Sequence, residues 1–325
     1  MFAYLLRRIL YAIPVLIGVN LITFSLFFML NSPDDMARAH LGYKNVNQAA
    51  VERWKIEYGY NKPLFYNPKD DGIQKITDTL FFQKSVKLFS FDFGSSDGGS
   101  DISYDITQRM WPSLAVAIPI LLLGLLVEIT FAILMTFFRA TYLDFGGVLF
   151  CIILMSISGL FYIIGGQYLI GKLLNLVPIS GYDGGFSAFK FVILPVVVGV
   201  IGGLGGSARW YRTIFLEEVS KDYVRTARGK GLSEIKVLFK HVLKNAMVPI
   251  LTGIVVIIPM LFMGSLVLES FFGIPGLGSY TIDAIQQQDF AIVRAMVFLG
   301  SVLYIIGLVL TDISYTLVDP RVRLE

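Results

Sequence analysis

Six long apolar stretches constrain this chain more than any other feature of its sequence. They cover residues 9–30, 113–138, 146–170, 191–208, 248–268 and 293–315. The hydrocarbon core of a bilayer is about 30 Å thick, and a helix needs about 20 mainly apolar residues to cross it. The stretches are long and do not alternate in polarity, which excludes a membrane β-barrel. The sequence therefore predicts an all-α membrane protein with six transmembrane helices.

The composition of the chain agrees with a lipid environment. Of its 325 residues, 55% are hydrophobic and only 16% are charged, whereas soluble domains carry about 25% charged residues. Cys151 is the only cysteine and lies in an apolar run, so we expect it to be buried packing. Two histidines, His40 and His241, are too few to predict a metal site. A net charge of +3 gives no support for a nucleic-acid partner.

The first apolar stretch has a signal peptide as its alternative interpretation. Arg7 and Arg8 precede it, and Ala37-Arg38-Ala39 resembles a cleavage site. The stretch is longer than the ~7–15 apolar residues of a signal peptide, and the cleavage-like tripeptide lies well past its end. We therefore expect a retained transmembrane helix.

Lysine and arginine residues indicate the orientation of the chain. With six spans, the cations of the short loops and of both ends fall on one side, which the positive-inside rule assigns to the cytoplasm. They are Arg7, Arg8, Arg139, the cations of loop 209–247, Arg321 and Arg323. Both termini are then cytoplasmic, and a large region between the first two helices lies outside. Residues 73–89 of that region are compatible with one short amphipathic helix.

The loop between the fourth and fifth stretches is rich in cations and has helical periodicity. Its apolar residues predict two amphipathic helices. The first would bury Val219, Tyr223 or Val224, and Ala227, and the second would bury Ile235, Leu238, Phe239, Val242 and Ala246. Gly229 and Gly231 lie at the junction, where a bend is inexpensive. Ser233 would cap the second helix, with Glu234 in its first turn.

Two kinds of partner suit this basic loop. Basic amphipathic helices bind anionic lipid headgroups. The acids among the cations suit contact with a specific cytoplasmic protein; they are Glu217, Glu218, Asp222 and Glu234. The residues alone leave both alternatives open.

The segment DYVRTARGKGLSEIKVLFKHVLKNAMVP resembles the EAA motif of binding-protein-dependent ABC importer permeases of the dipeptide, oligopeptide and nickel subfamily. Arg225-Thr226-Ala227 stand where the general motif has Glu-Ala-Ala. The resemblance implies a coupling helix that docks on an ATP-binding subunit. The residues that it assigns to this contact are Asp222, Tyr223, Arg225, Thr226, Ala227 and Gly231.

Further blocks extend the resemblance to nearly the whole chain. They include YLLRRILYAIPVLIGVNLITF near the amino terminus, LNLVPISGY at 174–182, ESFFGIPGLGSYTIDAIQQQDFAIVRA at 269–295, and VDPRVRL at the carboxyl end. The amino-terminal block is typical of the first of two paired permeases. Two departures stand out: Ser156–Phe161 lacks the proline that is usual in the family, and residues around 67–87 look additional.

The resemblance implies a type I ABC importer permease fold in four parts. These are an amino-terminal transmembrane helix at 1–30, an extracytoplasmic region at 31–108, an ABC transporter type-1 transmembrane domain at 109–316 with its coupling loop at 209–247, and a cytoplasmic tail at 317–325. It also implies a multi-pass protein of the bacterial cytoplasmic (inner) membrane.

The implied function is a transport subunit that is not itself an enzyme. It would form half of an alternating-access pathway for di- and oligopeptides or a related solute. Its partners would be a second homologous permease, two ABC ATPase subunits, an extracytoplasmic solute-binding protein and membrane lipid. The chain lacks the motif G-x-x-x-x-G-K-[ST], so no cofactor is expected on it, and ATP and Mg²⁺ would bind the partner ATPases.

Alternative functions remain at this stage. A nickel–metallophore or antimicrobial-peptide transporter of the same family would share these features. A secondary transporter would lack the EAA-like loop, and no internal repeat favours one. A membrane enzyme would need a nucleophile and base that cannot be assembled from this sequence.

Glu128 lies near the middle of the second apolar stretch. An acid within a membrane is a candidate for the substrate path. The alternative is an interhelical hydrogen bond or a protonated buried carboxyl, and Asn20 has a similar alternative as a contact between helices. Two glycine pairs four residues apart, Gly199/Gly203 and Gly202/Gly206, predict close helix packing, and we expect it against the partner permease. The glycines at 273–278 predict a turn.

Overall fold

The computed structural model of the protein describes residues 2–42 and 47–318. The described residues are helical apart from loops and one isolated bridge between Ser95 and Asp101. They divide into two compact units: an outer unit of residues 1–109 and 280–309, and a central unit of residues 110–279 and 310–324. Arg321 and Arg323, and most of the predicted tail, lie outside the described residues.

Five helical segments are long and apolar enough to cross a membrane, and a bent pair of helices would make a sixth. The five lie in α1 (Phe2–Leu30), α6 (Ile102–Phe137), α9 (Ala188–Val219), the continuous run from α11 (Glu234–Val237) to η5 (Leu261–Met263), and α15 (Phe290–Val318). They turn large aliphatic side chains outward, such as Leu122 and Leu126 of α6, which are 61% and 64% exposed. This confirms the all-α fold, with five or six candidate membrane spans.

The third predicted span is not one continuous helix. The structure has α7 (Tyr142–Ser156), α8 (Gly159–Gly166) and the π-helical η2 (Gln167–Leu173), with an 87° bend between the two parts. Ile157 and Ser158 are extended, with ψ of 127° and 143°. The hydroxyl of Tyr162 donates to the carbonyl of Leu154 at 2.7 Å, so a carbonyl near the interrupted end finds a donor across the break. The bend forms here without a proline.

The predicted helix at 73–89 is also interrupted. It consists of α4 (Gln74–Thr77), α5 (Leu80–Ser85) and the 3₁₀ turn η1 (Val86–Ser90). Asp78 ends α4 with non-helical angles and pairs with Lys62. Thr79 then caps α5, because its hydroxyl accepts the backbone N–H of Phe82 at 3.3 Å. The ion pair of Asp78 and the cap at Thr79 therefore interrupt the single helix that the apolar periodicity predicts.

Aromatic side chains form the core of the outer unit. Trp54 of α3 (Gln48–Glu57) stacks on Tyr60 with ring centroids 5.3 Å apart. Phe24 and Phe28 of α1 and the side chains of α2 (Pro33–Leu41) belong to the same buried cluster. Asn20 of α1 donates to the carbonyl of Ser85 at 2.9 Å, which confirms its interpretation as a hydrogen-bonding contact between helices.

Helix α9 packs closely against its neighbours in the central unit. An alanine Cβ at position 205 would lie 2.7 Å from the carbonyl oxygen of Cys151 on α7, and one at position 199 would lie 2.6 Å from Ile120 of α6. Close packing is thus confirmed at Gly199, within the chain. Cys151 is buried, as expected. A Cβ at Gly206 would meet nothing within 4 Å, so its contact with a partner permease stays a prediction.

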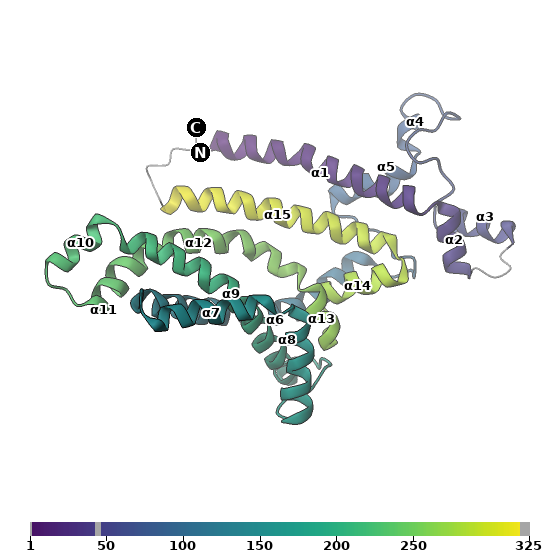
Figure 1. The fold of residues 1–325 in the computed structure, drawn as a ribbon. Helices are drawn as coiled ribbons and strands as arrows, with labels where there is room; N and C mark the ends of the chain where they lie inside the picture. The colour runs from purple at the N-terminus through teal and green to yellow at the C-terminus, as the bar shows by residue number, and fades with distance from the viewer. Residues whose placement is uncertain (1, 43–46, 319–325) are drawn as a thin grey trace. The chain divides into compact units, whose positions relative to one another are not determined.

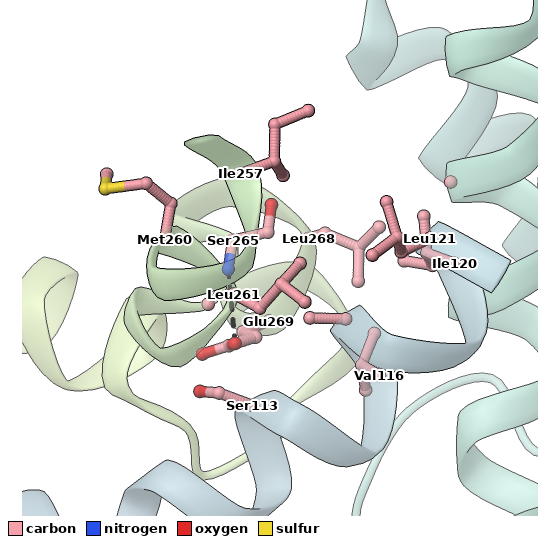
Figure 2. A pocket seen from close by; sticks show the side chains of 13 residues that line it. Ser113, Val116, Ile120, Leu121, Ile257, Met260, Leu261, Ser265, Leu268 and Glu269 are labelled. Atoms are coloured by element: carbon pink, nitrogen blue, oxygen red, sulfur yellow. Dashed lines mark hydrogen bonds between the residues drawn. The ribbon is translucent and has the colours of Figure 1, made fainter. Parts of the chain in front are cut away.

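A buried carboxylate holds the turn between α13 (Leu266–Phe272) and α14 (Leu277–Gln287). Glu269 is 1% exposed and accepts the backbone N–H groups of Ser265, Gly278 and Ser279 at 3.2, 2.7 and 3.2 Å. The N–H of Leu277 donates to the Ser113 hydroxyl of α6 at 2.8 Å, beside Glu269 (Figure 2). The predicted turn at 273–278 is confirmed, and Glu269 is its anchor.

Replacing Gly276 by alanine tests how tightly this turn is built. The new Cβ would lie 2.2 Å from Oε2 of Glu269 and 2.4 Å from Oγ of Ser113, so both polar groups would have to move. We expect a loss of about 1–3 kcal/mol in the free energy of unfolding, seen as a lower melting temperature of the detergent-purified protein. The matched variant Gly206→Ala, which meets open space, should melt like the wild type. Equal melting of the two variants would contradict this account.

Candidate functional site

The basic loop folds as two short helical pieces at one end of the central unit, where α9 ends and the α11–α12 run begins (Figure 1). Helix α10 spans Asp222–Gly229, and Gly231 follows it with a φ of +79°. That left-handed conformation favours glycine. Ser233 occupies the N-cap position of α11, as predicted, but its side chain makes no capping hydrogen bond. The predicted pair of helices and the glycine turn are confirmed.

The inward face of α10 matches the prediction, and that of the second piece does not. Val224 and Ala227 are 0% and 4% exposed and join Val219 in one apolar cluster. Ile235 and Phe239, predicted to be buried, are 60% and 56% exposed. The buried positions of this piece are instead Val237, Leu238, Val242 and Ala246.

A widened turn explains the shifted face. The segment η4 (Leu238–Val242) is π-helical, and the N–H of Leu243 donates to the carbonyl of Leu238. A π-turn accommodates one residue more than an α-turn, so the buried positions upstream and downstream of it cannot follow a single helical period. The widened turn leads into α12 (Leu243–Met260).

The predicted coupling residues divide into an exposed and a buried set. The side chains of Asp222 and Arg225 are 93% and 74% exposed and pair at 3.3 Å. Thr226 is exposed, and its hydroxyl donates to the carbonyl of Asp222 at 3.0 Å. Ala227 faces the core, and Tyr223 is half-buried. The outward face of α10 therefore presents Asp222, Arg225 and Thr226.

Glu218, at the end of α9, joins that helix to α10. It is 8% exposed; one of its oxygens accepts the hydroxyl of Tyr223 at 2.5 Å, and the other pairs with Lys221. The side chain of Asn245 on α12 also bonds to Tyr223. Burial and the neighbouring Glu218 raise the pKa of Tyr223 to about 12, so its hydroxyl remains a donor at neutral pH. Sequence reasoning treated Glu218 only as one acid among cations; its position beside buried Val219 was the available signal.

Two arginines that looked like loop cations are also fixed by acids. Arg228 binds Glu234 through Nε at 2.7 Å and Nη2 at 3.3 Å, which ties α10 to α11. Arg212 of α9 binds Asp144 of α7 through the same two groups at 2.8 and 2.7 Å. Bidentate pairs of this kind fix geometry as well as charge. Neither guanidinium is therefore free to act as a simple lipid anchor.

Glu128 is buried between two glycines and a serine. It is 8% exposed, and its carboxyl group bonds to the Ser207 side chain of α9. A Cβ at Gly203 would lie 3.1 Å from its Oε1, so the absence of a side chain there makes room for the carboxyl group. This geometry favours an interhelical contact. A role in the substrate path stays a prediction.

A cavity of about 340 Å³ lies beside the Glu269 turn (Figure 2). Aliphatic side chains from α6, α12 and α13 form most of its wall, including Ile120, Ile257 and Leu268. Ser113, Ser265 and Glu269 supply its polar edge, where the Ser265 N–H points at the Glu269 carboxylate. Such a lining accepts an apolar group. No group of three potential metal ligands occurs among the residues that the structure describes.

Comparisons with known proteins agree with this arrangement. Residues 128–324 match the family model of the binding-protein-dependent transport system inner membrane component. Residues 1–70 match the model of the amino-terminal part of such membrane components.

Named relatives match along their full length. The oligopeptide transport system permease protein AppB of Bacillus subtilis is 30% identical over 99% of this chain and 100% of its own. The dipeptide transport system permease protein DppB of the same organism is 27% identical over 99% of this chain and 98% of its own. A relative in Brucella abortus is 33% identical across both full lengths.

The family match covers more than half of the chain, and the helices supply five or six candidate spans. The chain therefore belongs to the family of inner membrane components of binding-protein-dependent transport systems, and it is a multi-pass inner membrane protein.

Proposed function

We propose that this chain is the permease subunit of an ATP-driven ABC importer for small peptides. The relatives named as oligopeptide and dipeptide permeases support the solute class. Paired with a second permease, the chain would form half of an alternating-access pathway. We further propose six spans, with the bent α7–α8 pair as the third, both termini in the cytoplasm, and residues 31–108 outside.

The observation that carries the coupling proposal is the mixed surface at α10. Asp222 and Arg225 are its most exposed charged groups, and exposed Ile235 and Phe239 lie on the adjoining segment. A surface built to bind anionic lipid would gain nothing from an exposed aspartate. Apolar side chains next to paired charges are typical of a protein interface. We therefore assign this face to an ATPase subunit.

The contacts behind α10 support transmission of movement. Glu218 joins α10 to α9 through Tyr223, and the Tyr223–Asn245 contact joins it to α12. Arg212 and Asp144 hold the adjacent part of α9 against α7. A helix fixed in this way moves its supporting helices when the ATPase moves it. No chemistry is required of the chain itself.

Transport should depend on both ATP and the solute-binding protein. The complete complex, reconstituted in proteoliposomes, should accumulate a radiolabelled dipeptide only with ATP on the ATPase side and binding protein on the other. A non-hydrolysable ATP analogue is the control. Equal uptake without hydrolysable ATP would contradict the proposed function.

Reversing the exposed charge of Arg225 should weaken docking. In Arg225→Glu, two acids would lie together on α10 in place of the ion pair. This face would then no longer match the charges of the ATPase surface, so copurification of the ATPase subunits should fall about tenfold or more. Arg53→Glu, a reversal at an exposed arginine of the predicted external region, is the matched control. The assignment of this face fails if the ATPase is retained equally by both variants.

Removing the Tyr223 hydroxyl should separate docking from coupling. Tyr223→Phe leaves the exposed face of α10 intact but takes a hydrogen-bond partner from buried Glu218, which costs about 1–3 kcal/mol locally. We expect normal copurification of the ATPase and fewer solute molecules imported per ATP hydrolysed. Tyr142→Phe, at a side chain that is 95% exposed, should change neither quantity. An unchanged ratio in Tyr223→Phe would exclude Glu218–Tyr223 as part of the coupling path.

A further inference from the structure

Arg294 is a buried cation with an unused donor. It lies near the start of α15 and is 6% exposed. Its Nε donates to the carbonyl of Phe290 at 3.3 Å, while the buried Nη1 has no hydrogen-bond partner among the described residues. Burial of a polar group without a partner is costly. An external acceptor would remove that cost.

Arg294 also lines a polar cavity of about 390 Å³ within the outer unit. Lys84, Lys87 and Arg294 line it together with Asp92 and the backbone around Gly94. The size is within the range of small-ligand sites, about 300–1,000 Å³. Three cations from two distant segments of the chain therefore line one partly open cavity, with Arg294 buried and Lys87 exposed.

Lys84 is held in place before any ligand arrives. Its Nζ donates to the carbonyl of Tyr58 at 2.9 Å and lies 4.8 Å from the centre of the Tyr60 ring. Burial, and then the charge of Arg294, lower the pKa of Lys84 below its ordinary value. The two cations thus repel each other across a partly dehydrated space, which an anion between them would relieve.

The charge balance of the cavity favours an anion. Three cations and one acid, Asp92, line it, and Asp97 lies close enough to act electrostatically on Lys84. The lining therefore has an excess of positive charge, which an anion would offset. A guanidinium also matches the two oxygens of a carboxylate in geometry.

We propose that Arg294, Lys84 and Lys87 form a carboxylate-binding site in the outer unit. Two sources supply that chemistry at the predicted external face: the carboxyl terminus of a peptide solute, which rests on the proposed function, and an acidic side chain of the solute-binding protein. The site is distinct from the coupling surface and from the Glu269 cavity.

The test uses the purified complete complex in phosphatidylcholine nanodiscs, without ATP, so that it is independent of transport. Radiolabelled dialanine binding is measured by equilibrium dialysis, with dialanine amide as competitor, and affinity for the ligand-free binding protein is measured by biolayer interferometry. The variants are Arg294→Gln and Lys84→Gln. Arg53→Gln and Lys69→Gln, at exposed positions of the same unit, are the matched controls.

If the peptide is the source, both site variants should bind dialanine about ten- to hundredfold more weakly, and the amide should compete poorly with wild type. If the binding protein is the source, its affinity should fall by a similar factor while dialanine binding is unchanged. Either result supports the site. The melting temperature of Arg294→Gln should equal or exceed that of the wild type, because an unsatisfied buried cation has been removed.

Three results would overturn the proposal. The first is that neither affinity changes relative to the control variants. The second is an effect of the variants that is present only in phosphatidylglycerol nanodiscs, which would indicate a lipid phosphate. The third is lower affinity in Arg294→Gln with a lower melting temperature, while Lys84→Gln binds normally, which would make Arg294 a structural residue.

Discussion

The close approach of α9 to α7 is the contact on which the central unit depends. Glycine at position 205 lets the backbones approach so nearly that a single methyl group would lie 2.7 Å from the carbonyl oxygen of Cys151. In a membrane, where apolar surfaces gain little by leaving lipid, such packing is a main source of helix association. The Arg212–Asp144 pair fixes the same two helices further along. Helix α9 can therefore hold α10 at a defined position.

Buried charges in this chain have different partners and therefore different consequences. Glu269 is surrounded by backbone donors and stabilises a turn, and Glu218 is bound by Tyr223 and Lys221 and joins two helices. The Nη1 donor of Arg294 has no hydrogen-bond partner in the part of the chain that the structure describes. The first two groups are satisfied within the chain, so neither of them calls for a ligand. The third is not, which is why it suggests a ligand.

The long helices and the amphipathic pieces of the basic loop were predictable from the sequence, because apolar length indicates a membrane span and apolar periodicity indicates a helix. Which face of the second piece is buried was not predictable, because one π-turn at Leu238 changes the helical period without altering the composition. The break after Ser156 carries no proline to signal it. The stabilising role of Glu269 was not predictable, because it depends on backbone N–H groups that the turn brings together. Contacts of this kind leave no periodic trace in a sequence.

The widened turn at η4 has a consequence for how the two ends of one helical run are specified. A regular helix would give the long apolar span and the segment before it a common rotational phase, so the apolar stripe of the span would dictate which side chains of that segment face outward. One extra residue in the turn uncouples those phases. The span can keep Ala246 and Ile250 in the core while Ile235 and Phe239 face outward. Substitutions at Ile235 and Phe239 need not disturb the packing of the span.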